Sequence, residues 1–374
     1  MPIVSVVKCE AYDLDAVRQA VTAVLAPLGG MERFVQPGMQ VLLKPNLLSA
    51  TDLERAVTTH PTVVEAVVEQ VQAAGGTALI GDSPAGPVVE QPPVWRVGGM
   101  AGVAERTGAA LVAFDGVAWK RLNGHDYYIA RPVLEADLVI NLPKLKTHIF
   151  ALYTGAVKNL FGVIPGTRKR ELHCRAPSLP EFSEVLGDVL ALVQPGLTLM
   201  DGVTGQEGHG PGPGGTPRRY DCLAASTDGV ALDAVITRAM GFRPSEVLHV
   251  TQAGARGLGV SDPDVIRVEG DRRALEWGAV DRPRFPFNFR LPTWIGGWMG
   301  RAVQLRPQLD EAECAGCGRC AEVCPAEAIH PLDGKPPQFD LDACIGCFCC
   351  AEICPRAAIR PRRGLLARLL GVDV

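Results

Sequence analysis

Nine of the 12 cysteines lie in one short stretch near the end of the 374-residue chain, and eight of these nine share a regular spacing. They form two runs with the same spacing, each followed by a proline, and every member of the second run lies 30 positions after its counterpart. The runs are Cys314, Cys317, Cys320 and Cys324, then Cys344, Cys347, Cys350 and Cys354. The spacing Cys-x2-Cys-x2-Cys-x3-Cys-Pro is typical of bacterial modules that bind two [4Fe–4S] clusters. We interpret the stretch as an internal duplication that binds two such clusters.

In this spacing the three close thiolates bind one cluster and the fourth binds the other. The sequence therefore predicts two ligand sets, Cys314, Cys317, Cys320 and Cys354 for one cluster and Cys344, Cys347, Cys350 and Cys324 for the other. Structural zinc and disulfides are the competing interpretations. Zinc sites typically use two separated pairs of ligands, and disulfides are rare in cytosolic proteins. Cys349 is extra to the pattern and is interpreted as a packed neighbour, and Cys9, Cys174 and Cys222 as small buried hydrophobes.

The rest of the chain alternates between short β-rich runs and segments with helical spacing. The expected strands are Ile3–Lys8, Gln40–Lys44, Ala78–Gly81, Ala110–Phe114, Leu138–Leu142, Leu197–Met200, Leu223–Ser226 and Val265–Val268. The expected helices are Pro61–Ala74, with Thr59 as its cap, Ser178–Val193 and Ala231–Met240. Such alternation favours an α/β fold, a largely parallel sheet flanked by helices, followed by a small α+β two-cluster ferredoxin-like domain.

Four regions follow from this pattern. Residues 1–281 form the α/β domain, 282–307 an aromatic and basic linker, 308–360 the two-cluster domain and 361–374 a basic amphipathic tail. Residues 307–355 carry a net charge of −7, whereas 282–306 and 356–374 carry +5 and +4. The linker is expected to pack the two domains together, and the tail to pack on the acidic module. The alternatives for the linker are a lip for an apolar substrate or a patch that docks on a partner or an anionic membrane, and the alternative for the tail is binding to a membrane surface.

Polar side chains follow several of the expected strands, and ligands of such sheets bind beyond the carboxyl ends of strands. The candidate substrate-binding residues are Lys44, Asn46, Asp82, Asn159 and Asp201. The candidate catalytic residues are Lys144, Lys146, His148 and Lys158. Converging cations favour an anionic substrate, a carboxylate or a phosphate. Solvated loop lysines are the alternative interpretation.

Four separated segments, LLKPN, NLPKLKTH, GAVKNLFG and ALDAVITRAMGF, resemble the family known as domain of unknown function 362. Members often carry a two-cluster ferredoxin module after that domain, and residues 308–360 resemble such a module. The resemblance implies a shared site at the matched polar positions and a distant relation to the lactate racemase fold. Those positions are Lys44, Asn46, Lys144, Lys146, His148, Lys158, Asn159, Asp228 and Asp233. The family supplies no settled reaction.

Other features exclude function classes. The net charge of −4 excludes a globally basic nucleic-acid binder. The opening residues lack the pattern of a signal peptide, which predicts a cytoplasmic location. Gly205–Gly215 matches a dinucleotide fingerprint by letter, but no strand–helix context surrounds it, so a mobile loop, a lid over the site or a plain connector, is expected there.

These features together predict an iron–sulfur oxidoreductase. An external donor (ferredoxin, flavodoxin or reductase) would reduce one cluster, and the electron would reach a small anion or an unpredicted cofactor in the α/β domain. Lys144, Lys146 and Lys158 would neutralise the anion, while His148 would supply a proton. Two alternatives stay open: a non-enzymatic electron-transfer or docking subunit for a partner enzyme, and a redox-neutral, isomerase-like enzyme with structural or sensory clusters.

Overall fold

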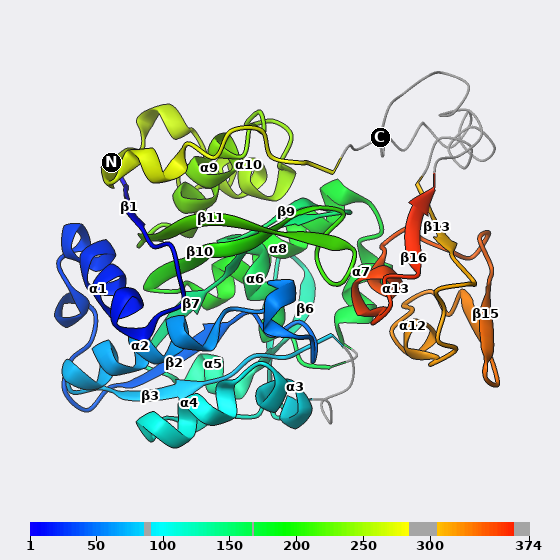
Figure 1. Cartoon of the computed structure of the whole chain (residues 1–374), viewed down its shortest axis with the longest axis horizontal. Coiled ribbons are helices and arrows are strands. Elements are labelled where there is room, and N and C mark those ends of the chain that lie inside the picture. The colour runs from blue at the N-terminus through cyan, green and yellow to red at the C-terminus, as the bar shows by residue number, and fades with distance from the viewer. Residues whose placement is uncertain (86–90, 167, 284–304, 363–374) are drawn as a thin grey trace.

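The computed structural model describes residues 1–85, 91–166, 168–283 and 305–362. A large α/β domain and a small strand-rich module stand side by side (Figure 1). The aromatic linker, apart from its ends, and the tail from residue 363 onward lie outside the described residues. Among the described helices, none has the length and apolar character needed to cross a bilayer.

A ten-stranded sheet forms the centre of the α/β domain. Its strand order is β12-β1-β11-β10-β7-β2-β3-β4, with β8 beside β10 and β9 beside β8. The strands are β1 (Ile3–Lys8), β2 (Gln40–Pro45), β3 (Thr77–Ile80), β4 (Ala110–Leu111), β7 (Leu138–Leu142), β8 (Lys144–His148), β9 (Leu152–Thr154), β10 (Leu197–Gly208), β11 (Gly215–Ser226) and β12 (Arg267–Gly270). Six of the nine strand pairings are parallel, which confirms the expected fold class.

Helices cover both faces of this sheet. They are α1 (Leu14–Leu25), α2 (Pro61–Ala73), α3 (Gln91–Val97), α4 (Met100–Thr107), α5 (Arg131–Glu135), α6 (Ala156–Asn159), α7 (Arg168–Arg175), α8 (Leu179–Val193), α9 (Gly229–Ala239) and α10 (Leu248–Ala255). Short 3₁₀ helices are η1 (Ala26–Leu28), η2 (Met31–Arg33), η3 (Leu53–Arg55), η5 (Leu160–Val163), η6 (Pro263–Val265) and η7 (Arg272–Leu275). A separate hairpin pairs β5 (Val117–Leu122) with β6 (His125–Ala130).

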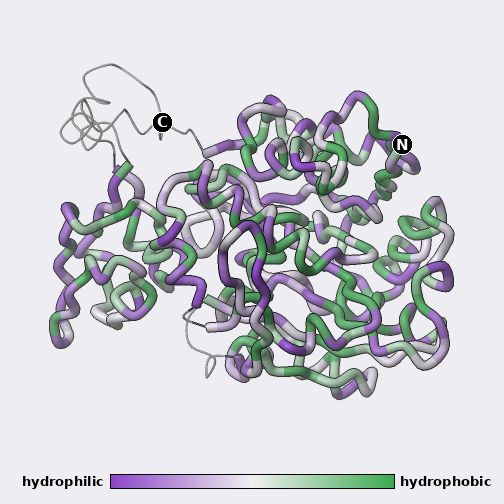
Figure 2. Tube along the Cα trace, turned by 180° about the vertical axis from the view of Figure 1, so that it is seen from behind, coloured by the Kyte–Doolittle hydropathy of each residue, from purple (hydrophilic) through white to green (hydrophobic). Residues whose placement is uncertain are grey.

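Alternation along the strands produces two hydrophobic cores, one on each face of the sheet. Val41 and Leu43 of β2 pack into the core that contains α1 and α2, while Leu42 packs into the core that contains α8 and α9. Successive side chains of a strand point to opposite faces, so a continuous apolar run fits a sheet covered on both sides. Hydrophobic stretches accordingly run through the interior of this domain (Figure 2).

Two local predictions need correction. His60, not Thr59, caps α2, because its Nδ1 accepts the Thr62 amide at 3.2 Å. The Thr59 hydroxyl instead joins two strand ends, accepting from the Asn46 amide and donating to the Leu142 carbonyl. The glycine-rich segment is also not a loop throughout: β10 and β11 stay paired out to Gly208 and Gly215, and only the residues between them connect the strands.

The small module consists of two similar halves. Strand β13 (Arg306–Leu309) pairs with β16 (Ile359–Arg362), and β14 (Ile329–Leu332) pairs with β15 (Lys335–Phe339). The short helices are α12 (Arg319–Glu322) and α13 (Cys349–Ile353). Backbone conformation repeats with the sequence: Gly316 and Gly346 both have positive φ, and so do Gly318 and Phe348. The structure thus retains the duplication seen in the cysteine spacing.

Candidate functional site

The cysteines converge in two groups within the small module. Cys314, Cys317, Cys320 and Cys354 line one cavity, although Cys354 belongs to the second run. Cys350 lies near cysteines of both runs: burial raises the pKa of its thiol, and the nearby Cys347, Cys344, Cys324 and Cys320 raise it further. The lining of the cavity agrees with the first of the two crossed ligand sets, and the second set stays a prediction.

Backbone amides point at the sulfur atoms in the same way in both halves. The Gly316 amide donates to Cys314 Sγ at 3.4 Å, and the Gly346 amide donates to Cys344 Sγ at 3.4 Å. Likewise the Ala328 and Ala358 amides lie 3.3 Å from the sulfurs of Cys324 and Cys354. Amide donors stabilise ligating thiolates and tune the potential of an iron–sulfur cluster. The residues therefore fit the group that the spacing implies.

A single metal ion is a different case. In the part of the chain that the structure describes, no three His, Cys, Asp or Glu side chains are arranged to hold one metal ion. Cys9 and Cys222 are buried, as expected. Cys174 is exposed, which corrects its interpretation as a buried hydrophobe, and its Sγ lies 3.0 Å from the Pro325 carbonyl oxygen of the small module.

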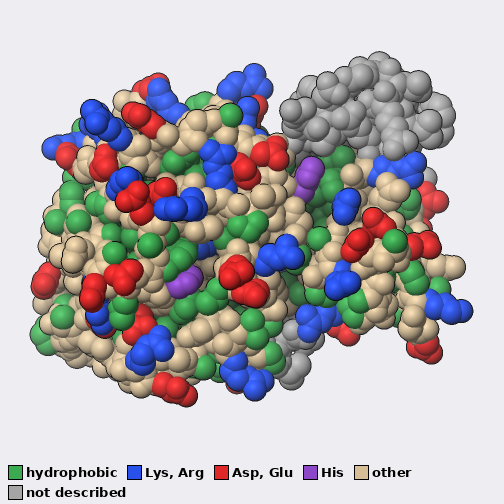
Figure 3. All heavy atoms as spheres, in the orientation of Figure 1, with side chains coloured by type: hydrophobic (Ala, Val, Ile, Leu, Met, Phe, Trp, Pro, Cys, Tyr) green, Lys and Arg blue, Asp and Glu red, His purple; other side chains and the backbone are tan. Residues whose placement is uncertain are grey.

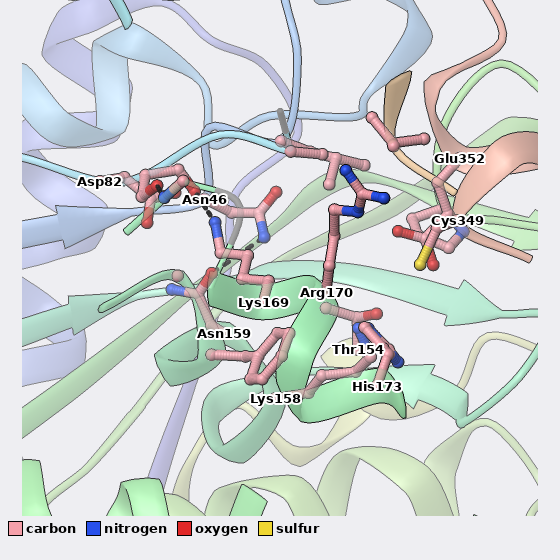
Figure 4. A pocket seen from close by; sticks show the side chains of 18 of the residues that line it. Asn46, Asp82, Thr154, Lys158, Asn159, Lys169, Arg170, His173, Cys349 and Glu352 are labelled. Carbon is pink, nitrogen blue, oxygen red and sulfur yellow. Dashed lines mark hydrogen bonds between the residues drawn. The ribbon is translucent and has the colours of Figure 1, made fainter. Parts of the chain in front are cut away.

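A cavity of about 110 Å³ lies where the α/β domain meets the small module. Its walls come from both: Asn46, Asp82, Lys146, Lys158 and Lys169 on one side, and Glu322, Cys349 and Glu352 on the other. Figure 4 shows Asp82 and Asn46 at one end, Glu352 and Cys349 at the opposite end, and Lys169 and Arg170 between them. A water molecule takes about 30 Å³, so the space suits a ligand of a few atoms.

Three lysines line this cavity, and the pKa of each is lowered. Burial, opposed by the Asp82 carboxylate, lowers the pKa of Lys169 to about 7. Burial and the neighbouring Lys158 lower the pKa of Lys146 to about 7. Burial also lowers the pKa of the partly buried Lys158, whose Nζ lies 5.9 Å from the centroid of the Phe182 ring. An anion in the cavity would stabilise the charged form of all three ammonium groups.

A chain of amides holds two of the lining residues in place. Lys146 Nζ donates to Asn46 Oδ1 at 2.9 Å and to the Val57 carbonyl at 2.6 Å. Asn46 Nδ2 in turn donates to Asn159 Oδ1 at 2.9 Å, and Asn159 Nδ2 donates to Asn141 Oδ1 at 2.8 Å. These bonds connect the ends of β2, β7, β8 and α6. The network fixes Lys146 at the cavity wall.

Lys44 and Asp82 form a buried pair behind the cavity. Lys44 Nζ lies 2.8 Å from Asp82 Oδ1, and the Leu47 amide donates to Asp82 Oδ2 at 2.7 Å. Asp82 lines the cavity, whereas Lys44 does not. A Cβ on Gly162 would overlap Asp82 Oδ1 and lie 2.8 Å from Lys44 Nζ, so only glycine fits there. The second glycine of the GAVKNLFG segment thus leaves room for an ion pair.

Lys144 and Asp201 belong to a second cluster, away from the lining residues of the cavity. Lys144 Nζ lies 2.8 Å from Asp201 Oδ2 and donates to the Tyr12 hydroxyl at 2.7 Å. The Tyr12 ring stacks on His60, with 3.6 Å between centroids. Pro143 separates β7 from β8, and Lys144, Lys146 and His148 each meet different partners. The structure thus does not bring all the candidate residues into one site.

His148 joins the two domains. Its Nδ1 accepts the amides of Phe150 and Ala151 at 3.0 and 3.1 Å, so the proton of the neutral ring resides on Nε2, which lies 3.0 Å from Glu352 Oε1 of α13. Burial and Lys158 lower the pKa of His148 to about 4. Burial alone would raise the pKa of Glu352, but His148 and Lys158 lower it to about 2. His148 is not among the lining residues of the cavity.

Sequence reasoning missed several lining residues, namely Thr154, Lys169, Arg170, His173, Cys349 and Glu352. Thr154 is 3% exposed, and its hydroxyl has no hydrogen-bond partner among the described residues. The basic segment RKRELHCR was the available signal for α7, which carries Lys169, Arg170 and His173. Nothing in the spacing of the chain indicates that Glu352 meets His148.

Asp233 and Asp228, the two remaining positions of the family segments, stabilise the starts of helices. Asp233 of α9 accepts the amides of Ala156 and Val157 at 2.7 and 2.9 Å and so holds the start of α6, the helix that carries Lys158. Burial raises the pKa of Asp233 to about 7. Asp228 caps α9 through the amides of Val230 and Ala231.

The model of the domain of unknown function DUF362 matches residues 41–238, more than half of the chain. The chain belongs to the DUF362 family. A 4Fe-4S dicluster domain matches residues 306–355, so iron–sulfur binding is part of this family member's function. The thylakoid-associated protein sll1697 of Synechocystis sp. is 37% identical over 270 residues, which cover 69% of this chain and 80% of the relative.

Two solved structures are similar at low identity. The lactate racemase apoprotein from Thermoanaerobacterium thermosaccharolyticum has a TM-score of 0.36 at 14% identity, covering 53% of this chain and 50% of that one. A protein from Thermotoga maritima has a TM-score of 0.35 at 10% identity, covering 68% and 60%.

Proposed function

We propose that this DUF362 family member is an iron–sulfur oxidoreductase that reduces a small anion held in the cavity between its two domains. One observation carries the proposal: Cys349, directly before Cys350, and Glu352, between Cys350 and Cys354, face three lysines across the same cavity, Lys146, Lys158 and Lys169. When bound by the eight cysteines, two [4Fe–4S] clusters would supply single electrons.

The residues of the chain would bind and protonate the substrate. Lys158 and Lys169 would neutralise a carboxylate or phosphate, and the unpartnered Thr154 hydroxyl would donate a hydrogen bond to it. We assign the proton donor to Lys146, because it lines the cavity and its pKa of about 7 suits a general acid near neutral pH. His148, the donor expected from the sequence, would instead hold Glu352 in place.

The electron and proton counts close for a two-electron reduction, such as carbonyl to alcohol. Two electrons come from an external one-electron carrier (ferredoxin, flavodoxin or reductase), one at a time. Lys146 donates one proton to the substrate and a water molecule donates the other. A further proton from solvent then reprotonates Lys146. The buried Lys44–Asp82 and Lys144–Asp201 pairs would support the walls without touching the substrate.

An anaerobic titration tests this function. Holoprotein reduced with dithionite is mixed with a panel of small carboxylates and phosphates, and bleaching and recovery of the cluster absorbance are followed. Reoxidation by one anion, lost in Lys158→Met and Lys169→Met, is the expected result. Lys120→Met, at an exposed lysine of the β5–β6 hairpin that does not line the cavity, is the matched control. Reoxidation only by a partner protein would instead support an electron-carrier subunit.

The proposed location is the cytoplasm, with peripheral membrane contact as the alternative. The name of the Synechocystis relative, a thylakoid-associated protein, motivates the alternative. Flotation of the full chain with vesicles of neutral or anionic lipid distinguishes the two, since membrane contact through basic segments requires anionic lipid.

A further inference from the structure

The two cysteine groups differ in their exposure to solvent. Cys317 is exposed, whereas Cys347, which occupies the equivalent position 30 residues later, is buried. The small module is otherwise duplicated in spacing, in backbone conformation and in its amide–sulfur bonds. The difference therefore arises from what surrounds each half.

The α/β domain covers the group that contains Cys347. Arg170 donates to the Cys324 carbonyl at 2.7 Å and to the Glu322 carbonyl at 3.3 Å. Phe348, directly after Cys347, packs with Ile149 of the α/β domain. Contacts of this kind leave no room for a second protein on that side.

Two arginines line the cavity at the group that contains Cys317, within a module that is acidic as a whole. Among the described residues, Arg319 and Arg356 are the only charged side chains that line the cavity at this group. Their equivalents 30 positions away, at the covered group, are the uncharged Cys349 and Ala326. On the face of the module seen in Figure 3, Lys and Arg side chains are interspersed with Asp and Glu, so the two arginines mark a local site rather than a basic surface.

We propose that the surface around Cys317, with Arg319 and Arg356 at its rim, is the docking site for a one-electron carrier protein with an acidic face. Carboxylates around the redox centre of the carrier would pair with the two guanidinium groups and bring that centre next to the exposed cysteine. This inference rests on the electron-transfer part of the proposed function. Rim charges of this kind act mainly on the association rate and its salt dependence.

Binding and cluster reduction of the holoprotein, both measured without substrate, test the docking site. The probe is a purified plant-type ferredoxin with a strongly negative net charge. Binding of the oxidised probe is measured by calorimetry, and cluster reduction by the reduced probe is followed by stopped-flow absorbance. We expect Arg356→Gln and Arg319→Gln each to weaken binding, and the double variant to lower the affinity by about tenfold at low salt. Reduction by dithionite should be unchanged in all variants.

Two controls keep the outcome specific. Lys120→Gln removes an exposed charge from the β5–β6 hairpin, outside the small module, and should have no effect. Glu313→Gln removes an exposed acid one residue before Cys314 and should leave binding unchanged or strengthen it. Weaker binding in Glu313→Gln with normal binding in the arginine variants would overturn the proposal, because the partner would then carry a basic face. Loss of anion turnover with normal carrier binding would refute the proposed substrate site alone.

Discussion

Lys146 has a buried amine whose pKa is lowered by burial and shifted in opposite directions by its charged neighbours. Lys158 and Lys144 lower its pKa, while Glu352 and Asp82 raise it, and burial sets the net direction. With a pKa of about 7, the side chain gains or loses its proton near neutral pH. A buried lysine in this state can both attract an anion and release a proton to it.

Anion binding to the oxidised holoprotein should therefore weaken as pH rises. Lys146 and Lys169 are both largely protonated below pH 7 and lose their charge above it. We expect the affinity of the anion identified in the titration to fall by at least about tenfold between pH 6 and 9, as measured by calorimetry. Lys146→Arg keeps its charge across this range and should make the pH dependence shallower, because only Lys169 then loses its charge. An affinity independent of pH would contradict the assignment.

Gly162 is required by the ion pair that it borders. Gly162→Ala should lower the free energy of unfolding by about 2 kcal/mol, because the new methyl group overlaps Asp82 and forces buried atoms apart. Gly102→Ala in α4 is the control, since its methyl group would meet only the flexible end of the Arg106 side chain. Thermal unfolding of both variants measures the difference. Equal stability of the two would show that the pair has room to move.

At the scale of elements, the connection between β10 and β11 contacts the small module. A Cβ on Gly212 would lie 2.6 Å from the Glu352 carbonyl oxygen, and the Ile149 amide donates to the Gly210 carbonyl at 2.7 Å. Close backbone approach explains why glycine recurs in this segment. The expected mobile loop is therefore part of the contact between domains.

Gly212→Ala should loosen that contact. Hydrogen exchange of α13 should quicken in the variant, because the Cβ pushes against the Glu352 backbone. Gly108→Ala is a matched control: its φ of +73° is also positive, but nothing lies within 4 Å of the added atom. Both variants carry the backbone strain, and only Gly212→Ala adds the overlap. Similar rates of hydrogen exchange in α13 of the two variants would refute the proposed contact between Gly212 and α13.

The elements of the sheet were predictable where apolar runs end at turn residues. The expected bounds of β1 and β7 match at both ends for this reason. The β5–β6 hairpin was missed, since Trp119, Lys120 and Arg121 are all exposed and show no buried face. The cavity was half predictable: lysines at strand ends indicated one wall. Its other wall depends on how two domains dock, which no local pattern encodes.

At the scale of the whole molecule, the two domains depend on different sources of stability. The α/β domain has a hydrophobic core on each face of its sheet. The core of the small module consists of cysteines and a few apolar side chains, among them Ile329 and Ile359. A module of that size needs bound metal for its stability.

Removal of iron from the holoprotein by anaerobic chelation should therefore unfold the module selectively. We expect amides of residues 306–362 to lose protection from hydrogen exchange, while β2 and β7 stay protected by the two large cores. Reconstitution with iron and sulfide should restore protection. Loss of protection in β2 and β7 as well would show that the α/β domain cannot fold without the clusters.

Phe348 stands where the other half of the duplication has a glycine, and it retains the glycine's backbone angle, with φ of +61° against +74° at Gly318. Phenylalanine adopts a positive φ less readily than glycine does, but its ring packs against Ile149 of the α/β domain. A free two-cluster protein with glycine at this place would share the cysteine framework yet lack the adhesive residue. We therefore expect a separate ferredoxin with glycine at this position to bind the α/β domain more weakly than the fused module does.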